Sequence, residues 1–105
     1  MQPDWHIHSC SVLNEEQRSQ LMDLWNKEYP SHLGYNSVGE FNVYLSQLKD
    51  QHHYLLMDQH KNIHAWAFDF MRDHERWFAI ILKRDAQGQG IGTEMLNLLK
   101  TQNTD

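Results

Sequence analysis

The sequence has little of what marks secreted and membrane-spanning proteins. Its 105 residues include one cysteine, Cys10, and no apolar run longer than Trp77 to Leu82. A single cysteine excludes an intramolecular disulfide, and that run falls far short of the roughly 20 residues that cross a bilayer. The amino-terminal segment also lacks the basic and apolar regions of a signal peptide. We therefore expect a cytoplasmic protein with no membrane partner.

Positive charge is also scarce. Nine Lys and Arg residues stand against 14 Asp and Glu residues, which gives a formal charge of -5. Proteins that bind nucleic acid use basic side chains to neutralise phosphates. The charge balance therefore argues against a nucleic-acid partner and favours a neutral or cationic one.

The chain length allows one hydrophobic core. A chain of 105 residues can bury enough surface to fold without disulfides or metals. Two prolines and five glycines leave no stretch that resembles a linker or a low-complexity segment. We expect a single domain over residues 1–105.

Local patterns predict the order strand, helix, helix, three strands, glycine loop and helix. Asn14 and Gln17 match a capping box at the start of the first helix, and Pro30 ends its pattern. Ser37 and Glu40 match a second capping box. Polar turns between short β-favouring runs indicate antiparallel hairpins. The fold class is therefore α/β (α+β) with a mostly antiparallel sheet. The expected strands are 5–13, 53–57, 63–71 and 77–82.

Three of the five glycines occupy alternate positions in the stretch AQGQGIGTEML, just after the last strand. Glycines between a strand and a helix let an anion approach the backbone and often bind phosphate. The triphosphate pattern G-x-x-x-x-G-K-[ST] is excluded, because Thr93 and Glu94 follow Gly92 where lysine is required. The dinucleotide pattern G-x-G-x-x-G fits only Gly88 and Gly90, and too few residues follow for its acidic residue.

The segment from Gln87 to Gly92 resembles the Q/R-x-x-G-x-G/A pyrophosphate loop of the GCN5-related N-acetyltransferase (GNAT) superfamily. In such a loop the amides and dipole of a helix start attract the pyrophosphate of coenzyme A. The order of strands and helices also resembles the amino-terminal two-thirds of that fold. The resemblance implies an acetyl-CoA-dependent N-acetyltransferase that acts on a primary amine of a small molecule or peptide.

The resemblance also implies where coenzyme A binds. Backbone groups of Ile80 and Leu82 would hold the pantetheine arm. Gln87 stands where arginine is commoner, so the loop carries one charge fewer, although Lys83 and Arg84 are near in sequence. The residues expected around the pyrophosphate, chiefly through their amides, are Gln87, Gly88, Gln89, Gly90, Gly92 and Thr93.

The resemblance stops where the family would continue with a further strand and helix. That part normally forms the other wall of the acetyl-CoA groove. Without it, the strand from Trp77 to Leu82 becomes an exposed apolar edge, which natural proteins rarely leave uncovered. Three outcomes stay open: a fragment of a longer enzyme, a homodimer through this edge, and a degenerate member of the family that binds another ligand. The alternative to an enzyme is a non-catalytic module that dimerises or binds coenzyme A. By its unbroken hydrophobicity alone, the same strand is expected in the middle of a sheet, buried on both faces.

Two carboxylates are candidates for the base that accepts the amine proton. Glu75 precedes the last strand, where some acetyltransferases place such a carboxylate, and its alternative is a turn residue between Arg72 and Arg76. Asp69 lies in an otherwise apolar strand. A buried carboxylate there would suit a base, whereas a solvent-facing one would be unremarkable.

The remaining candidates are histidines and tyrosines. Tyr29 and Tyr35 lie near the connection between the first two helices, which flanks the acceptor site in the family. Three histidine pairs lack the cysteine or carboxylate partners that complete a metal site, so we expect surface histidines and no metal. These pairs are His6/His8, His52/His53 and His60/His64.

Overall fold

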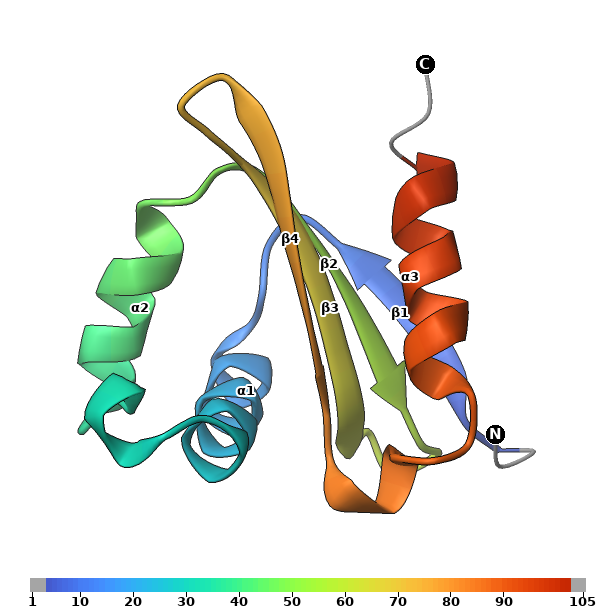
Figure 1. Cartoon of the computed structure of the whole chain (residues 1–105). Coiled ribbons are helices and arrows are strands. Elements are labelled where there is room, and N and C mark those ends of the chain that lie inside the picture. The colour runs from blue at the N-terminus through green and yellow to red at the C-terminus, as the bar shows by residue number, and fades with distance from the viewer. Residues whose placement is uncertain (1–3, 103–105) are drawn as a thin grey trace.

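The structure of the protein, a computed structural model, describes residues 4–102. Figure 1 shows a twisted sheet with α1 and α2 on one face and α3 on the other. The order confirms the predicted fold class. The elements are β1 (His6–Cys10), α1 (Glu15–Glu28), the 3₁₀ turn η1 (Ser31–Leu33), α2 (Val38–Ser46), β2 (Lys49–Met57), β3 (Ile63–Arg72), β4 (Glu75–Leu82), the 3₁₀ turn η2 (Arg84–Ala86) and α3 (Ile91–Gln102).

The sheet follows the order of the chain. Its strands run β1-β2-β3-β4, and each is antiparallel to the next. The predicted hairpins are therefore confirmed. β2 begins at Lys49, earlier than the apolar pattern predicted, because its polar first half also pairs with β3 across an irregularity between Lys49 and His52. β1 is shorter than predicted and covers only His6–Cys10.

The predicted place of β4 in the middle of the sheet is wrong. In the described part of the chain β4 pairs only with β3 and is the last strand, and η2 and α3 follow it. β4 is therefore an edge strand. On it, Trp77 is 47% exposed and Phe78 is 56% exposed. Hydrophobicity predicted a strand but could not tell an edge from a centre. The exposed apolar edge is the arrangement that the GNAT resemblance implied.

Local hydrogen bonds explain where the first two helices begin. Asn14 Oδ1 accepts from the amide of Gln17 at 2.8 Å, and Gln17 Oε1 accepts from the amide of Asn14 at 2.8 Å. This is the predicted capping box. At α2, Ser37 Oγ accepts from the amide of Glu40, but the Glu40 carboxylate accepts from the amide of Asn36 instead of Ser37. The second box is thus half formed.

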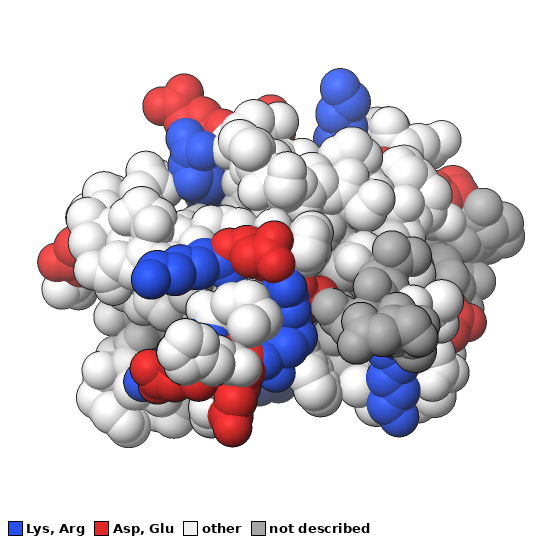
Figure 2. All heavy atoms as spheres, turned by 90° about the horizontal axis from the view of Figure 1, so that it is seen from above, with Lys and Arg blue, Asp and Glu red and all other residues white. Residues whose placement is uncertain are grey.

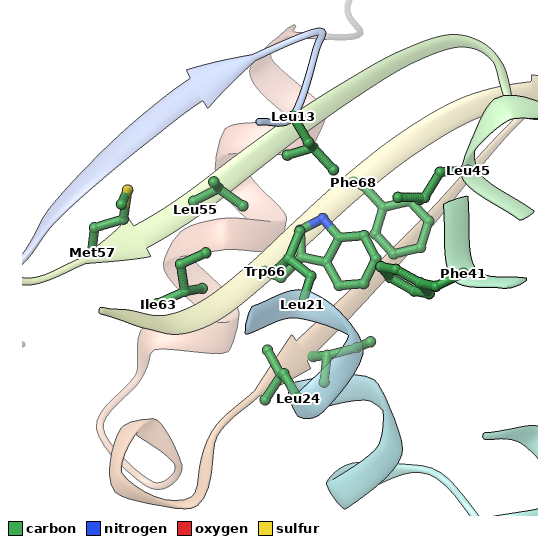
Figure 3. Close-up of a cluster of buried hydrophobic side chains, with 11 residues drawn as sticks. Leu13, Leu21, Leu24, Phe41, Leu45, Leu55, Met57, Ile63, Trp66 and Phe68 are labelled. Carbon is green, nitrogen blue, oxygen red and sulfur yellow. The ribbon is translucent and has the colours of Figure 1, made fainter. Parts of the chain in front are cut away.

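The strand β3 presents different side chains to the two helical layers. Trp66 lies against Phe41 of α2 in the cluster drawn in Figure 3, with ring centroids 6.0 Å apart. Ala65 and Ala67 pack on the opposite face in a second cluster with Met95 of α3. Small alanine side chains let α3 lie close to the sheet. The first turn of α3 is thereby held near the end of β4.

Two histidines are buried, which corrects the expectation of surface histidines. His53 has no exposed area and His64 is 8% exposed. Both have hydrogen-bond partners, which offset the free energy lost when a polar ring is buried.

Among residues 4–102, no helix combines the length and apolar content that a membrane span requires.

Candidate functional site

The connection between β4 and α3 is the candidate site. It leaves β4 at Leu82, passes through η2 and makes a turn over residues 87–90 before α3 begins. Gly88 and Gly90 both have φ +77, a left-handed conformation that costs other residues about 1 kcal/mol. A Cβ at either position would meet nothing within 4 Å. Glycine is therefore required there by the backbone angle, and the space outside the turn is open.

The start of α3 presents unpaired amides to that open space. Glu94 donates to the carbonyl of Gly90, which is the first bond of the helix. The amides of Ile91, Gly92 and Thr93 precede it and so have no acceptor within the helix. Together with the helix dipole they make this end attractive to an anion. Gly92 lies close to the end of β4, since a Cβ there would be 3.4 Å from Leu82 Cδ1.

The open edge of β4 adds backbone groups beside the loop. Lys83 donates its amide to the carbonyl of His64 at 2.9 Å, which marks a hydrogen-bonded pair in the register of β3 and β4. Such pairs alternate along an antiparallel ladder. The intervening residues Phe78, Ile80 and Leu82 therefore direct their N–H and C=O groups away from β3. The two positions expected to contact pantetheine, Ile80 and Leu82, are thus both outward-facing.

Hydrogen bonds from Gln87 and Gln89 hold the loop in place. Gln87 Nε2 donates to Glu28 Oε1 at 3.1 Å and to the Leu82 carbonyl at 3.0 Å. The amide of Gln87 donates to the carbonyl of Arg84. Gln89 Nε2 donates to a backbone carbonyl of η2. These side chains tie the loop to α1, to β4 and to η2.

A pocket of about 510 Å³ lies between α1 and η2, just before the glycine turn. Lys27, Lys83 and Arg84 line it, and so do the acidic side chains of Glu28 and Asp85. The surroundings of the loop therefore carry both signs of charge. The end of the molecule that carries the β3–β4 turn also carries both signs of charge, and Figure 2 shows basic and acidic side chains side by side there.

Glu75 is separated from the loop by the length of β4. It is the first residue of that strand, it is exposed, and it pairs with Arg72 across the β3–β4 turn. Figure 1 shows that turn at the opposite end of the sheet from the loop. A strand of this length spans about 25 Å. The structure does not bring Glu75 and the glycines together.

Asp69 is buried on β3 and paired. Its Oδ1 accepts from Arg76 at 2.8 Å and lies 2.9 Å from His52 Nδ1. Arg76 also binds Asp50, with Nη2 and Oδ2 2.5 Å apart. The Asp69 carboxylate thus belongs to an ion-pair network with Arg76 and His52.

Three of the four tyrosines gather around Trp25 of α1. The ring centroids of Tyr29, Tyr35 and Tyr44 lie 4.5, 5.6 and 5.4 Å from that of Trp25. Burial, with smaller contributions from Tyr35 and Tyr29, raises the pKa of Tyr44 to about 12. Tyr29 and Tyr35 therefore contribute to an aromatic cluster between α1 and α2.

Within residues 4–102, no three His, Cys, Asp or Glu side chains are grouped to hold a metal ion.

One buried contact beneath the loop was not predicted. His64 lies between the carboxylates of Asp58 and Asp85. These three residues lie in the β2–β3 turn, in the strand that follows it and in η2, so no local pattern links them. Only the closure of the sheet brings the β2–β3 turn against η2.

Comparison with solved structures identifies the fold. A protein assigned as a phosphinothricin N-acetyltransferase superposes with a TM-score of 0.69 at 14% identity, covering 91% of this chain and 63% of that one. A dodecameric spermidine N-acetyltransferase from Vibrio cholerae gives 0.63 at 17% identity, covering 93% and 61%. A GCN5-related glucosamine N-acetyltransferase region of a fungal multi-domain β-N-acetylglucosaminidase gives 0.61 at 16% identity, covering 84% and 11%.

These similarities show a GNAT-type fold, as the glycine loop and element order predicted. The chain spans less than two-thirds of the length of each of these structures. No protein-family model and no curated protein matches the sequence.

Proposed function

We propose that the β4–α3 loop binds acetyl-CoA and that the chain provides the coenzyme-binding half of an N-acetyltransferase site. The observation that carries this proposal is the set of three unpaired amides at residues 91–93, next to two glycines in the left-handed conformation. A helix start of this kind suits a pyrophosphate. The GNAT-type fold supports acetyl-CoA as the ligand that brings the pyrophosphate there.

The residues divide into two groups along the coenzyme. The amides of Gly88, Gln89, Gly90, Gly92 and Thr93 surround the pyrophosphate. The outward backbone groups of Ile80 and Leu82 extend the site along β4 and pair with the amides of the pantetheine arm. Gln87 contributes by fixing the loop against α1, and its side chain is already engaged with Glu28.

The proposed reaction is acetyl transfer to a primary amine. The amine nitrogen attacks the thioester carbonyl, the C–S bond breaks, the base takes the amine proton and the coenzyme thiolate takes up a proton. Glu75 is the proposed base, and its place at the far end of β4 requires the acetyl group to extend along the strand edge. The net charge of -5 favours a cationic amine as acceptor.

The test is a calorimetric titration of the chain with acetyl-CoA, with NADH as the control ligand. We expect saturable binding of acetyl-CoA that the Gly90→Asp variant abolishes, because a carboxylate and a strained backbone would both oppose the pyrophosphate. Gly39→Asp is the matched control. Gly39 lies in the first turn of α2, where a Cβ has room 3.7 Å from Ser37 Oγ. Equal binding by wild type and Gly90→Asp, or no binding by wild type, would contradict the proposal.

A homodimer through β4 is a second proposal and describes a non-catalytic module, because the two paired strands would take the outward backbone groups that the pantetheine arm would otherwise use. It rests on the exposure of Trp77 and Phe78 and on the outward backbone groups of the same strand. Antiparallel pairing of two β4 strands would cover both. Turnover of any amine by the 105-residue chain would favour the enzyme over the non-catalytic module.

A further inference from the structure

His64 connects a rigid turn of the sheet to the glycine loop. Its Nε2 lies 2.8 Å from Asp58 Oδ2, and its Nδ1 lies 2.9 Å from Asp85 Oδ2. The imidazole stacks on Trp5, with ring centroids 4.2 Å apart and planes inclined by 14°. The ring is thus held on both edges and on one face. Its backbone carbonyl also accepts from Lys83, at the entry to η2.

The Asp58 end of this connection is fixed. Asp58 Oδ1 accepts from the amides of His60 and Asn62, at 2.8 and 3.0 Å. These bonds lock the β2–β3 turn around the carboxylate. The hydrogen bond from His64, more than any other contact, holds the pKa of Asp58 well below its usual range.

The Asp85 end belongs to the loop. Asp85 is in the middle of η2, and its side chain is 49% exposed. Its backbone carbonyl accepts from Gln89 Nε2, so its position is linked to the glycine turn. The contact of His64 with the Asp85 carboxylate therefore restrains η2 and the glycine turn that follows it.

The two contacts place the imidazole between two hydrogen-bond acceptors. An ionised carboxylate can only accept, and an imidazolium can donate from both ring nitrogens, so a protonated ring satisfies both contacts. Its positive charge would also offset the charge of Asp85, which lies in η2 just before the glycine turn. Without that positive charge, the carboxylate of Asp85 would oppose an incoming pyrophosphate.

We infer that His64 is a positioning residue for the coenzyme loop, which holds η2 in place and keeps the charge beside the loop favourable for an anion. This inference rests on the proposed function for its consequence in binding, but the tether itself is independent of any ligand. Asp58 from the β2–β3 turn and Asp85 from η2 are the charged groups that face the ring among the described residues, with Trp5 on its face.

The tether is tested first without ligand, by amide hydrogen exchange. The amides of Lys83, Ala86 and Gln87 donate to backbone carbonyls around η2 and report on its opening. We expect exchange about tenfold faster at these amides in His64→Gln, while amides of α1 stay unchanged. Asp85→Ala should give the same local effect from an exposed position, which keeps the test valid if His64→Gln fails to fold. His60→Gln, an exposed histidine in the same region, is the matched control.

The charge effect is tested by titrating coenzyme A into wild type, His64→Gln and Asp85→Ala at one pH. Both variants lose the tether, but only His64→Gln keeps the Asp85 carboxylate beside the loop. Affinity should therefore fall about five- to tenfold more in His64→Gln than in Asp85→Ala. A merely structural role would weaken binding by the same factor in both variants.

The outcomes separate the two proposals. Faster exchange around η2 with no coenzyme A binding by any protein would keep the tether and overturn the proposed function. Binding by all proteins with equal exchange and equal affinities would overturn the role of His64 and keep the proposed function. Faster exchange with weaker binding by His64→Gln than by Asp85→Ala supports both.

Discussion

Trp66 Nε1 donates a hydrogen bond of 3.0 Å to Nδ1 of His53, beneath α1 and α2. Because Nδ1 accepts this bond, the ring proton lies on Nε2, which donates to Gln51 Oε1 at 2.7 Å. Gln51 Nε2 in turn donates to the carbonyls of Leu45 and Leu48, at the end of α2. The neutral imidazole thus links the sheet to α2 through a chain of hydrogen bonds.

Acid should destabilise the protein through this histidine. Burial lowers the pKa of His53 to about 4, whereas an unfolded histidine takes up its proton near pH 6.5. Between these values the unfolded state binds more protons, so the free energy of unfolding falls as the pH falls, by up to about 3 kcal/mol. Urea denaturation across this range measures the slope. His53→Gln should show a shallower slope, and an equal slope would contradict the assignment.

Removing Arg76 should destabilise the fold strongly. Its guanidinium is the hydrogen-bonded cation beside Asp69, whose side chain has no exposed area. Arg76→Met should lower the free energy of unfolding by about 3 kcal/mol, since the buried carboxylate of Asp69 loses its guanidinium partner. The control is Arg72→Met, in an exposed pair with Asp73 at 3.9 Å, which should cost less than about 1 kcal/mol. Equal costs in chemical denaturation would refute this account of the network.

Gly88→Ala should destabilise the chain by about 1 kcal/mol, although the space beside Gly88 is open. The cost comes from a left-handed φ of +77 and not from a clash. Gly39→Ala in α2 is the matched control and should stabilise by about 0.5 kcal/mol through helix propensity. Thermal and urea unfolding measure both. A neutral result at Gly88 would mean that the turn adopts another conformation.

Light scattering after gel filtration tests the β4 homodimer. We expect wild type to dimerise and Phe78→Lys to be monomeric, because a charge on an open edge opposes pairing with another strand. Val43→Lys is the control, since Val43 on α2 is 58% exposed, close to the 56% of Phe78. A wild-type protein that stays monomeric at high concentration would contradict the proposed homodimer.

Much of the fold could be predicted because its signals are local. Asn14 and Gln17 are three residues apart, and Pro30 ends the first helical pattern. The position of β4 could not be predicted in the same way. Trp77 and Phe78 have the composition of a central strand, and whether another strand lies beside them is a property of the whole sheet.

The same difference between local signals and long-range contacts applies to the candidate site. The glycines and the start of α3 form one continuous segment, so their spacing predicted a loop at a helix start. The roles of His53 and His64 depend on partners such as Trp66 and Asp85, which are 13 and 21 residues away. Spacing along the chain carries no sign of such contacts. Their burial could be found only once the strands were paired.

The order of the sheet has a consequence for how the chain folds. Adjacent strands in space are also successive in sequence, and the two later hairpins close over short turns. Hairpins of this kind form in microseconds because little loop entropy is lost. The two helices between β1 and β2 require a longer closure, and α3 rests on a surface that β3 provides. We therefore expect the unpaired amides at the start of α3 to reach their positions late in folding.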